Sequence, residues 1–182
     1  TAPLLSLRGV FTDAGGLSSN PSFALDILPC HKRVCVVGAS CTGKSRLALV
    51  MAGFFEQGFQ GEMFLNGIPM ADIPRRVRAK SIGWIPSNPL LVFSGIKKDL
   101  AGEIDLSLEM IGVNAPDEYT KLKRYIGLFR VDNLLSRDPY SLSGGEKVRA
   151  ALAVTLAKQP GLLLLDQIYD ALDPESLVEV RN

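Results

Sequence analysis

The sequence predicts an α/β fold with a mainly parallel central sheet, and three observations lead to this class. Short apolar segments alternate along the chain with longer segments of helical periodicity, the order that places parallel strands between helices. A glycine-bearing loop at 38–45 joins one apolar segment to one such helix. The leucine run 162–165 ends in Asp166, as a buried parallel strand does when its carboxyl end carries a polar group.

The N-terminal part predicts strands before and around the loop. Residues 4–11 and 23–28 alternate or cluster apolar side chains on either side of the turn-rich stretch 13–21, which predicts an antiparallel pair. The β-branched run 34–37 predicts a buried strand that feeds the loop, and the apolar pattern of 46–55 predicts a buried helix that starts from it.

The remaining elements follow in order. Residues 62–65 and 81–85 are short apolar runs ended by turn residues, and they predict two strands. Helical periodicity runs through 89–138 and is broken at 112–116, which predicts a helical subdomain. Residues 146–158 predict a further helix, stopped by a Gln-Pro-Gly sequence before the last strand.

Composition agrees with one compact soluble domain. The 182 residues are 47% hydrophobic, and 20 Lys and Arg balance 19 Asp and Glu, so no global field attracts nucleic acid or acidic lipid. Cys30, Cys35 and Cys41 form no even set and lack zinc-site spacing, which favours a reducing compartment. No apolar run approaches the ~20 residues that cross a bilayer, so we expect a cytoplasmic protein.

The loop 38–45 carries the strongest functional signal. Its pattern G-x-x-x-x-G-K-S is typical of loops whose N–H groups surround phosphate oxygens, whose lysine neutralises the β- and γ-phosphates and whose hydroxyl ligates Mg²⁺. The predicted strand and helix on either side argue against an incidental glycine loop. We therefore expect a nucleotide to be held by Gly38, Ala39, Ser40, Cys41, Thr42, Gly43, Lys44, Ser45 and Arg46.

Asp166 supports the same site. A carboxylate that follows a buried strand holds the Mg²⁺ of P-loop NTPases, and strand ends are where α/β folds bind ligands. Many strands end in Asp, so the residue gains meaning only together with the loop 38–45. The sequence therefore predicts Ser45 and Asp166 as ligands of Mg²⁺.

A third motif carries a family resemblance. Residues 142–146 read Leu-Ser-Gly-Gly-Glu, and residues 171–174 read Ala-Leu-Asp-Pro. Together with the loop and Asp166, these resemble the signature and D-loop of the ATP-binding cassette (ABC) family over essentially the whole chain. A different interpretation, Ser143 as the N-cap of a helix, explains Ser-Gly-Gly equally well but not the order of the motifs.

The resemblance implies an architecture and a cofactor. It implies a RecA-like P-loop NTPase core with an antiparallel β subdomain, over residues 1–88, and an inserted helical subdomain, over 89–138. Residues 139–182 then hold the signature helix, the Walker B strand and the D-loop, and the chain ends early. ATP is the implied nucleotide. In that family the signature, here Ser143, Gly144, Gly145 and Glu146, binds the γ-phosphate of ATP held by the opposite subunit.

The resemblance also implies partners. Residues 82–94 are similar to the family's Q-loop, which leads into the helical subdomain and contacts the membrane permease. The segment 137–141 resembles those of prokaryotic importers of the energy-coupling-factor type. We therefore expect a second ABC ATPase domain, in a homodimer or heterodimer, a permease subunit, and a peripheral location at the inner face of the membrane.

Two positions depart from the family where chemistry is concerned. Gln167 stands where the family has the glutamate that polarises the attacking water; an amide cannot accept that proton, and loss of a positioned base costs roughly 10²–10⁴ in rate. Ser87 stands where the Q-loop glutamine is expected. We name Lys44, Ser87 and Gln167 as the catalytic positions, and Ser87 joins Ser45 and Asp166 around Mg²⁺.

Further departures favour a naturally weakened site. Cys41 replaces a commoner glycine, Arg46 replaces a hydroxyl residue, and Phe11 is the nearest candidate for the aromatic that stacks on adenine. An introduced Glu-to-Gln change would explain Gln167 alone. The chain also ends before the family's switch histidine, which His31 cannot replace, so we expect low ATPase activity from this chain by itself.

Two other functions stay open. One is a non-transport ABC ATPase, a DNA-repair or translation factor; the other is a nucleotide sensor without useful turnover, which Gln167 and Ser87 favour. Nucleic acid is not expected as a partner, because no aromatic interleaving supports base stacking. We therefore interpret the local basic cluster as a solvated face: Arg75, Arg76, Arg78 and Lys80.

Overall fold

The computed structural model describes residues 2–11, 22–54, 59–110, 112 and 116–168. The chain divides into two compact units, residues 1–78 and residues 79–182. The division into 1–88, 89–138 and 139–182 stays a prediction.

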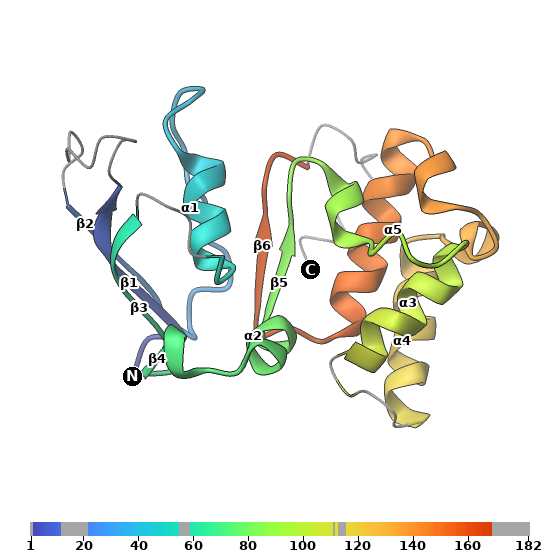
Figure 1. Cartoon of the computed structure of the whole chain (residues 1–182), viewed down its shortest axis with the longest axis horizontal. Coiled ribbons are helices and arrows are strands. Elements are labelled where there is room, and N and C mark those ends of the chain that lie inside the picture. The colour runs from blue at the N-terminus through green and yellow to red at the C-terminus, as the bar shows by residue number, and fades with distance from the viewer. Residues whose placement is uncertain (1, 12–21, 55–58, 111, 113–115, 169–182) are drawn as a thin grey trace. The chain divides into compact units, whose positions relative to one another are not determined.

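The first unit contains a four-stranded antiparallel sheet in the order β2-β1-β3-β4 (Figure 1). Its strands are β1 (Leu5–Phe11), β2 (Phe23–Ile27), β3 (Phe59–Leu65) and β4 (Ile68–Pro69). Leu5 pairs with Ile27 on one side and Leu65 on the other, and all three side chains are buried. The predicted antiparallel pair is confirmed, and the third strand begins earlier than predicted.

The tight turn between β3 and β4 follows from two residues. Asn66 and Gly67 have φ values of 52° and 79°, as a two-residue hairpin turn requires at both positions. Asn and Gly adopt this left-handed conformation most readily. The end of the predicted third strand therefore follows from turn chemistry alone.

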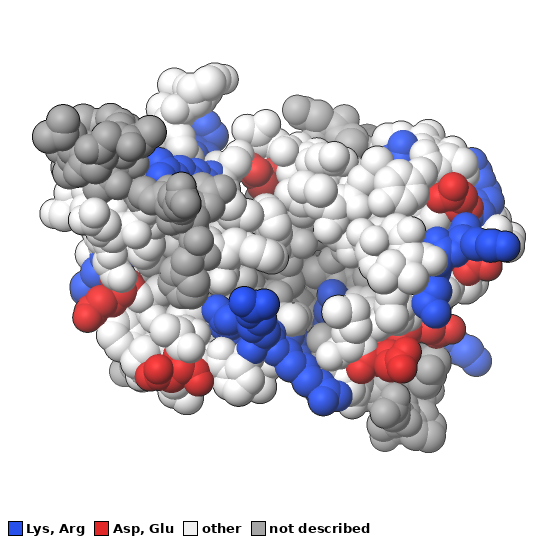
Figure 2. Space-filling view, viewed as in Figure 1, with Lys and Arg blue, Asp and Glu red and all other residues white. Residues whose placement is uncertain are grey.

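One helix, at Lys44–Met51, belongs to the first unit, and another, at Arg75–Ser81, crosses the boundary between the units at Arg78. The predicted helix is confirmed as α1 (Lys44–Met51), but only Val50 and Met51 are buried, so it is less buried than expected. The helix α2 (Arg75–Ser81) was not predicted, because a run dominated by basic residues shows no apolar periodicity. Figure 2 shows Lys and Arg side chains gathered where Figure 1 places α2.

One predicted strand is wrong. Residues 34–37 form no regular secondary structure, and Val34, Val36 and Val37 are 49%, 48% and 87% exposed. A strand needs a neighbour to receive its N–H and C=O groups, and no described segment pairs with this one. Its β-branched composition suits a strand but does not supply a partner.

The second unit packs helices beside a two-stranded parallel pair (Figure 1). The strand β5 (Ile82–Ile85) pairs in parallel with β6 (Leu162–Leu165), with Ile85 opposite Leu165. Both strands are confirmed. Of the described strands, only these two pair in parallel, because 34–37 does not join them. The mainly parallel core is therefore seen here only in part.

The helical part of the second unit is confirmed. The helices are α3 (Leu100–Met110), α4 (Pro116–Leu128) and α5 (Gly144–Ala157), with the 3₁₀ turns η2 (Pro89–Val92), η3 (Asp132–Leu134) and η4 (Pro139–Ser141). The predicted break falls before α4, which starts at Pro116. α5 lies at the centre, because it contacts α3, α4, β5 and η2.

Gly83 permits the close approach of β5 and α5. A Cβ atom at Gly83 would lie 2.7 Å from Thr155 Cγ2 and 2.9 Å from Pro160 Cγ. These distances are shorter than van der Waals contact, so a side chain would push the strand from the helix. This contact sets how α5 packs on the strand that leads to Ser87.

Candidate functional site

The loop 38–45 is closed by the side chain of Lys44. Lys44 Nζ donates hydrogen bonds to the carbonyl oxygens of Gly38 at 2.9 Å and Ala39 at 2.6 Å. Thr42 Oγ1 donates to the same Ala39 oxygen at 2.8 Å. The ammonium group is therefore held against the first residues of the loop, where its positive charge can meet an anion.

The loop ends at the N-terminus of α1. Gly43 is the N-cap, with φ +88° and ψ 12°, a left-handed conformation that glycine adopts without steric cost. Ser45 is exposed in the first turn of the helix. The helix N-terminus and the ammonium of Lys44 together form a site suited to phosphate.

Cys41 is held in an unfavourable backbone conformation. Its φ is +62°, in the left-handed region that side chains with a Cβ disfavour by about 1–2 kcal/mol. The side chain is exposed. The structure thus explains why a glycine suits this position better.

Arg46 and Phe11 are joined by a contact that the sequence does not predict. The guanidinium carbon of Arg46 lies 4.8 Å from the centroid of the Phe11 ring, a cation–π contact. Phe11 also stacks on Phe23 at 5.5 Å and contacts Phe59 at 5.5 Å. The ring of Phe11, the candidate for stacking on adenine, therefore links α1 to the antiparallel sheet. The strands β1, β2 and β3 each contribute one phenylalanine to this ring cluster.

The second unit brings three predicted residues to one edge. Because Ile85 is opposite Leu165, the residues that follow β5 and β6 leave the pair at the same end. Ser87 follows β5 and is exposed, Asp166 follows β6 and is 7% exposed, and Gln167 is exposed. Asp166 N donates to Ile85 O at 3.0 Å, which extends the pairing by one residue.

Gln167 shares the backbone feature of Cys41. Its φ is +55°, again left-handed for a residue with a side chain. Such strain is concentrated at functional positions. This left-handed conformation bends the backbone after Asp166, so that Gln167 does not continue the direction of β6.

Each unit, taken by itself, offers one oxygen group of the kind that Mg²⁺ takes when it is bound with a nucleotide. Mg²⁺ is held by one or two protein groups together with substrate phosphates, and it takes oxygen ligands. Asp166 offers a carboxylate and Ser45 an exposed hydroxyl. Among the described residues no group of three His, Cys, Asp or Glu could hold a metal without such a substrate.

The signature turn, residues 141–146, contains the N-terminus of α5. Ser143 is the N-cap: its Oγ accepts from Glu146 N at 3.5 Å, and Glu146 Oε2 accepts from Ser143 N at 2.7 Å. This reciprocal pair is a capping box, so the N-cap interpretation of Ser143 is confirmed. A Cβ at Gly144 would meet no atom within 4 Å, so no described residue covers that side of the turn.

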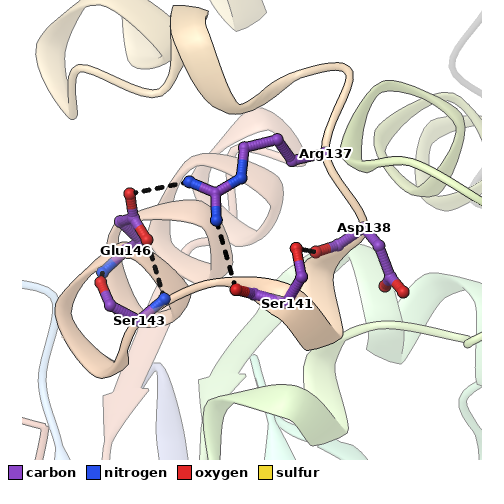
Figure 3. Close-up of polar contacts among 5 residues, drawn as sticks. All are labelled: Arg137, Asp138, Ser141, Ser143 and Glu146. Atoms are coloured by element: carbon purple, nitrogen blue, oxygen red, sulfur yellow. Dashed lines mark hydrogen bonds and ion pairs between the residues drawn. The ribbon is translucent and has the colours of Figure 1, made fainter.

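Arg137 contacts the signature turn at both of its ends. Figure 3 shows its guanidinium between two partners: Nη1 lies 3.1 Å from Glu146 Oε1, and Nη2 donates to Ser141 O at 3.2 Å. The hydrogen bonds to Ser143 lower the pKa of Glu146, and the charges of Arg137 and Arg149 lower it further. Glu146 is therefore a carboxylate at neutral pH.

The D-loop at 171–174 lies outside the described residues. A hollow of about 460 Å³ lies in the helical part of the second unit, lined by apolar residues that include Ile104, Leu122 and Ile126. None of the predicted site residues lines it, so it is not part of the candidate site.

No described helix combines the length and apolar character that crossing a bilayer requires.

Comparison with known proteins gives a family match. A family model described as ABC transporter matches residues 25–169. The chain is 35% identical over 147 residues to the energy-coupling factor transporter ATP-binding protein EcfA1 of Thermotoga maritima, covering 80% of this chain and 53% of that protein. It is 33% identical over 181 residues to the Fe(3+) ions import ATP-binding protein FbpC of Pseudomonas fluorescens, covering 98% and 49%. The chain spans about half the length of these curated relatives.

Two solved structures share the fold. One is an ATP binding subunit of an ABC transporter, with a TM-score of 0.81, 19% identity and coverage of 97% of this chain and 71% of that one. The other is cbiO1 from Clostridium perfringens, part of the ABC transporter complex cbiONQ, with a TM-score of 0.72, 19% identity and coverage of 99% and 71%. These structures confirm the predicted α/β fold class.

Proposed function

The chain belongs to the ABC transporter family, and from that premise we propose that it is the ATP-binding and ATP-hydrolysing part of a membrane transporter. One observation carries the proposal. The matched segment 25–169 contains a loop closed by Lys44, an acidic strand end at Asp166 and a capped glycine turn at 143–146. These would supply a cation, a metal ligand and a helix N-terminus, the groups that phosphoryl transfer requires.

The first unit would bind the phosphates. Lys44 would leave the carbonyl oxygens of Gly38 and Ala39 for the β- and γ-phosphates, while backbone N–H groups of 38–43 surround them. Ser45 and Asp166 would ligate Mg²⁺, which neutralises phosphate charge when it is bound, and Ser87 would act near it or through a water.

Stacking of Phe11 on adenine would require Arg46 and the neighbouring rings to move, which favours weak adenine binding.

Hydrolysis would be slow in this chain's own site. The amide of Gln167 accepts no proton from the attacking water, and it can only orient that water by hydrogen bonds. Loss of a base costs roughly 10²–10⁴ in rate. Binding, by contrast, depends on Lys44 and the loop.

A second ABC ATPase domain would complete the site. Ser143, Gly144 and Gly145 would face the γ-phosphate of ATP held by the partner domain, in a head-to-tail homodimer or heterodimer. The open side of Gly144 leaves room for that approach. The signature of this chain would then support ATP hydrolysis at the partner's site, whereas hydrolysis at its own site would stay slow.

A membrane permease is the second partner. Leu91, Ile96 and Tyr140 are 67%, 76% and 52% exposed, and a Cβ at Gly95 would lie 2.9 Å from the Tyr140 hydroxyl. Ile96 and Tyr140 are therefore neighbours beside the loop that follows Ser87. A permease that covers these apolar side chains would remove them from water, as an interaction surface does. Docking there would place the protein at the inner face of the membrane, and the named relatives favour an importer.

The test is ATP–Mg²⁺ binding and turnover by the protein, by Gln167→Glu and by Lys44→Ala, with oligomeric state read from the same samples. We expect the wild type to bind ATP with slow turnover, Gln167→Glu to gain about 10²-fold or more, and Lys44→Ala to lose binding. Absence of ATP binding in the wild type would refute the proposal. Binding without any gain in Gln167→Glu would favour a nucleotide sensor.

A further inference from the structure

We propose that Arg137 is a positioning residue for the signature turn, defined as residues 141–146, and that it acts through Glu146. Its guanidinium offsets the charge of Glu146 and joins the two ends of the turn, so that the N-terminus of α5 can receive phosphate. The inference rests on the proposed function, because it takes the signature turn to face ATP held by a second ABC ATPase domain.

The guanidinium of Arg137 contacts both ends of the signature turn. Arg137 contacts Glu146 Oε1 through Nη1 at 3.1 Å and the Ser141 carbonyl through Nη2 at 3.2 Å (Figure 3). Ser141 ends η4 and Glu146 lies in the first turn of α5. Because the guanidinium is planar and its donors are fixed relative to one another, the contact sets the separation of the two ends.

The backbone that carries Arg137 is itself anchored. Arg137 N donates to Leu134 O at 2.9 Å, and Arg137 O accepts from Leu100 N at 2.9 Å. The following turn is fastened by Asp138, whose Oδ1 accepts from Tyr140 N at 2.8 Å and whose carbonyl accepts from Ser141 Oγ at 2.7 Å. The guanidinium therefore extends from a fixed point on the helical part of this unit.

The charge of Glu146 requires an explanation of its own. A capping box needs only an acceptor at this position, and Gln serves as well as Glu. A carboxylate at a helix N-terminus competes with a bound anion for the same positive potential. Nearby charges of Glu146 and phosphate would repel each other, and Arg137 supplies the positive charge that offsets this repulsion.

Four N–H groups of the turn are already used, because Ser141 N donates to Asp138 O and Leu142 N donates to Pro139 O. Ser143 N donates to Glu146 Oε2, and Glu146 N donates to Ser143 Oγ. The donors left for phosphate are then the N–H groups of Gly144 and Gly145 and the hydroxyl hydrogen of Ser143. Their direction depends on how the box is held, which is the part that Arg137 contacts.

A double-mutant cycle separates this role from a structural one. The signature donor is the protein with Lys44→Ala, so that its own loop does not bind ATP. The acceptor is the protein with Ser143→Arg, so that only its loop binds ATP. Donors with Arg137→Gln, Glu146→Gln or both are titrated against labelled acceptor with ATP–Mg²⁺, and the dissociation constant of the mixed dimer is measured.

We expect Arg137→Gln to weaken association by about fivefold, as expected for a charge at a helix N-terminus. Glu146→Gln should weaken it less than Arg137→Gln does, and the double variant should match Glu146→Gln. The loss in Arg137→Gln should shrink at about 1 M salt, where screening is strong. Arg137→Lys keeps the charge without the guanidinium, and we expect an intermediate loss. Equal losses from Arg137→Gln in both backgrounds, or a loss that salt does not reduce, would overturn the inference.

Folding of the variants and the proposed ATP-binding function are tested by separate measurements. An ion pair in which the two side chains are 43% and 21% exposed contributes little to folding, so Arg137→Gln should fold; if it does not, Arg137→Lys carries the comparison with Glu146→Gln. An acceptor that fails to bind ATP on its own refutes the proposed function. An acceptor that binds ATP and associates with the unmodified donor, but shows an additive cycle, refutes the role of Arg137 alone.

Discussion

At the scale of single residues, backbone conformation connects two substitutions that the sequence presents as unrelated. Cys41 and Gln167 both have positive φ, at 62° and 55°, and both stand at positions that contact phosphate, metal or water in the proposed site. A side chain at such a position costs about 1–2 kcal/mol. The two residues therefore place strain where the proposed chemistry occurs.

Cys41→Gly should relieve this strain. We expect the free energy of unfolding to rise by up to about 1 kcal/mol, because the left-handed conformation costs glycine nothing while part of the gain is lost to the more flexible unfolded chain. The melting temperature of a chain this long would then rise by about 2–4 °C. Cys41→Ala is the control, since it removes the thiol but keeps the Cβ; an equal rise in both variants would contradict the explanation.

At the scale of elements, α5 connects the candidate site to the core. Its first turn carries the capping box of Ser143 and Glu146, and its middle is buried, with Leu152 and Val154 among the covered residues. Its later part meets β5 at Gly83. The same helix therefore presents the signature turn at one end and supports the strand of Ser87 further along.

Gly83→Ala should destabilise the second unit by about 1–3 kcal/mol, because the added methyl group overpacks the contact with Thr155 and Pro160. Gly127→Ala is the matched control. It lies in α4, where a Cβ meets nothing within 4 Å, and there alanine should stabilise the helix by about 0.5–1 kcal/mol. Denaturant unfolding of both variants measures the contrast, and a loss of the same size in Gly127→Ala would refute the packing argument.

At the scale of the whole molecule, the candidate groups are divided between two compact units. The loop 38–45 belongs to residues 1–78, whereas Asp166, Gln167 and the signature turn belong to residues 79–182. ATP would interact with groups of both units in the proposed function. Its binding should therefore stabilise the folded chain as a whole.

Thermal unfolding tests this linkage. At a concentration of ATP–Mg²⁺ one hundred times its dissociation constant, stabilisation should be about 2.7 kcal/mol, which raises the melting temperature of a chain of this size by roughly 5–10 °C. Lys44→Ala should show no rise with ATP but the same melting temperature without it, because Lys44 Nζ bonds only exposed loop carbonyls. An equal rise in Lys44→Ala would place ATP at another site.

The sequence by itself determined the features that a few consecutive residues encode. The loop 38–45, the strand before Asp166, the Asn66-Gly67 turn and the helix that Ser143 begins all follow from local spacing, turn chemistry and capping. Periodicity also predicted the helical character of 89–138. Each of these signals depends on neighbours within one or two turns of the chain.

Tertiary structure alone decided which distant segments meet. It left 34–37 unpaired with any described strand, placed Arg46 on Phe11, brought Ser87 and Asp166 to one strand edge through their register, and joined Arg137 to Glu146. No local pattern encodes these contacts, because each depends on how separate elements pack and which side chains that packing brings within reach.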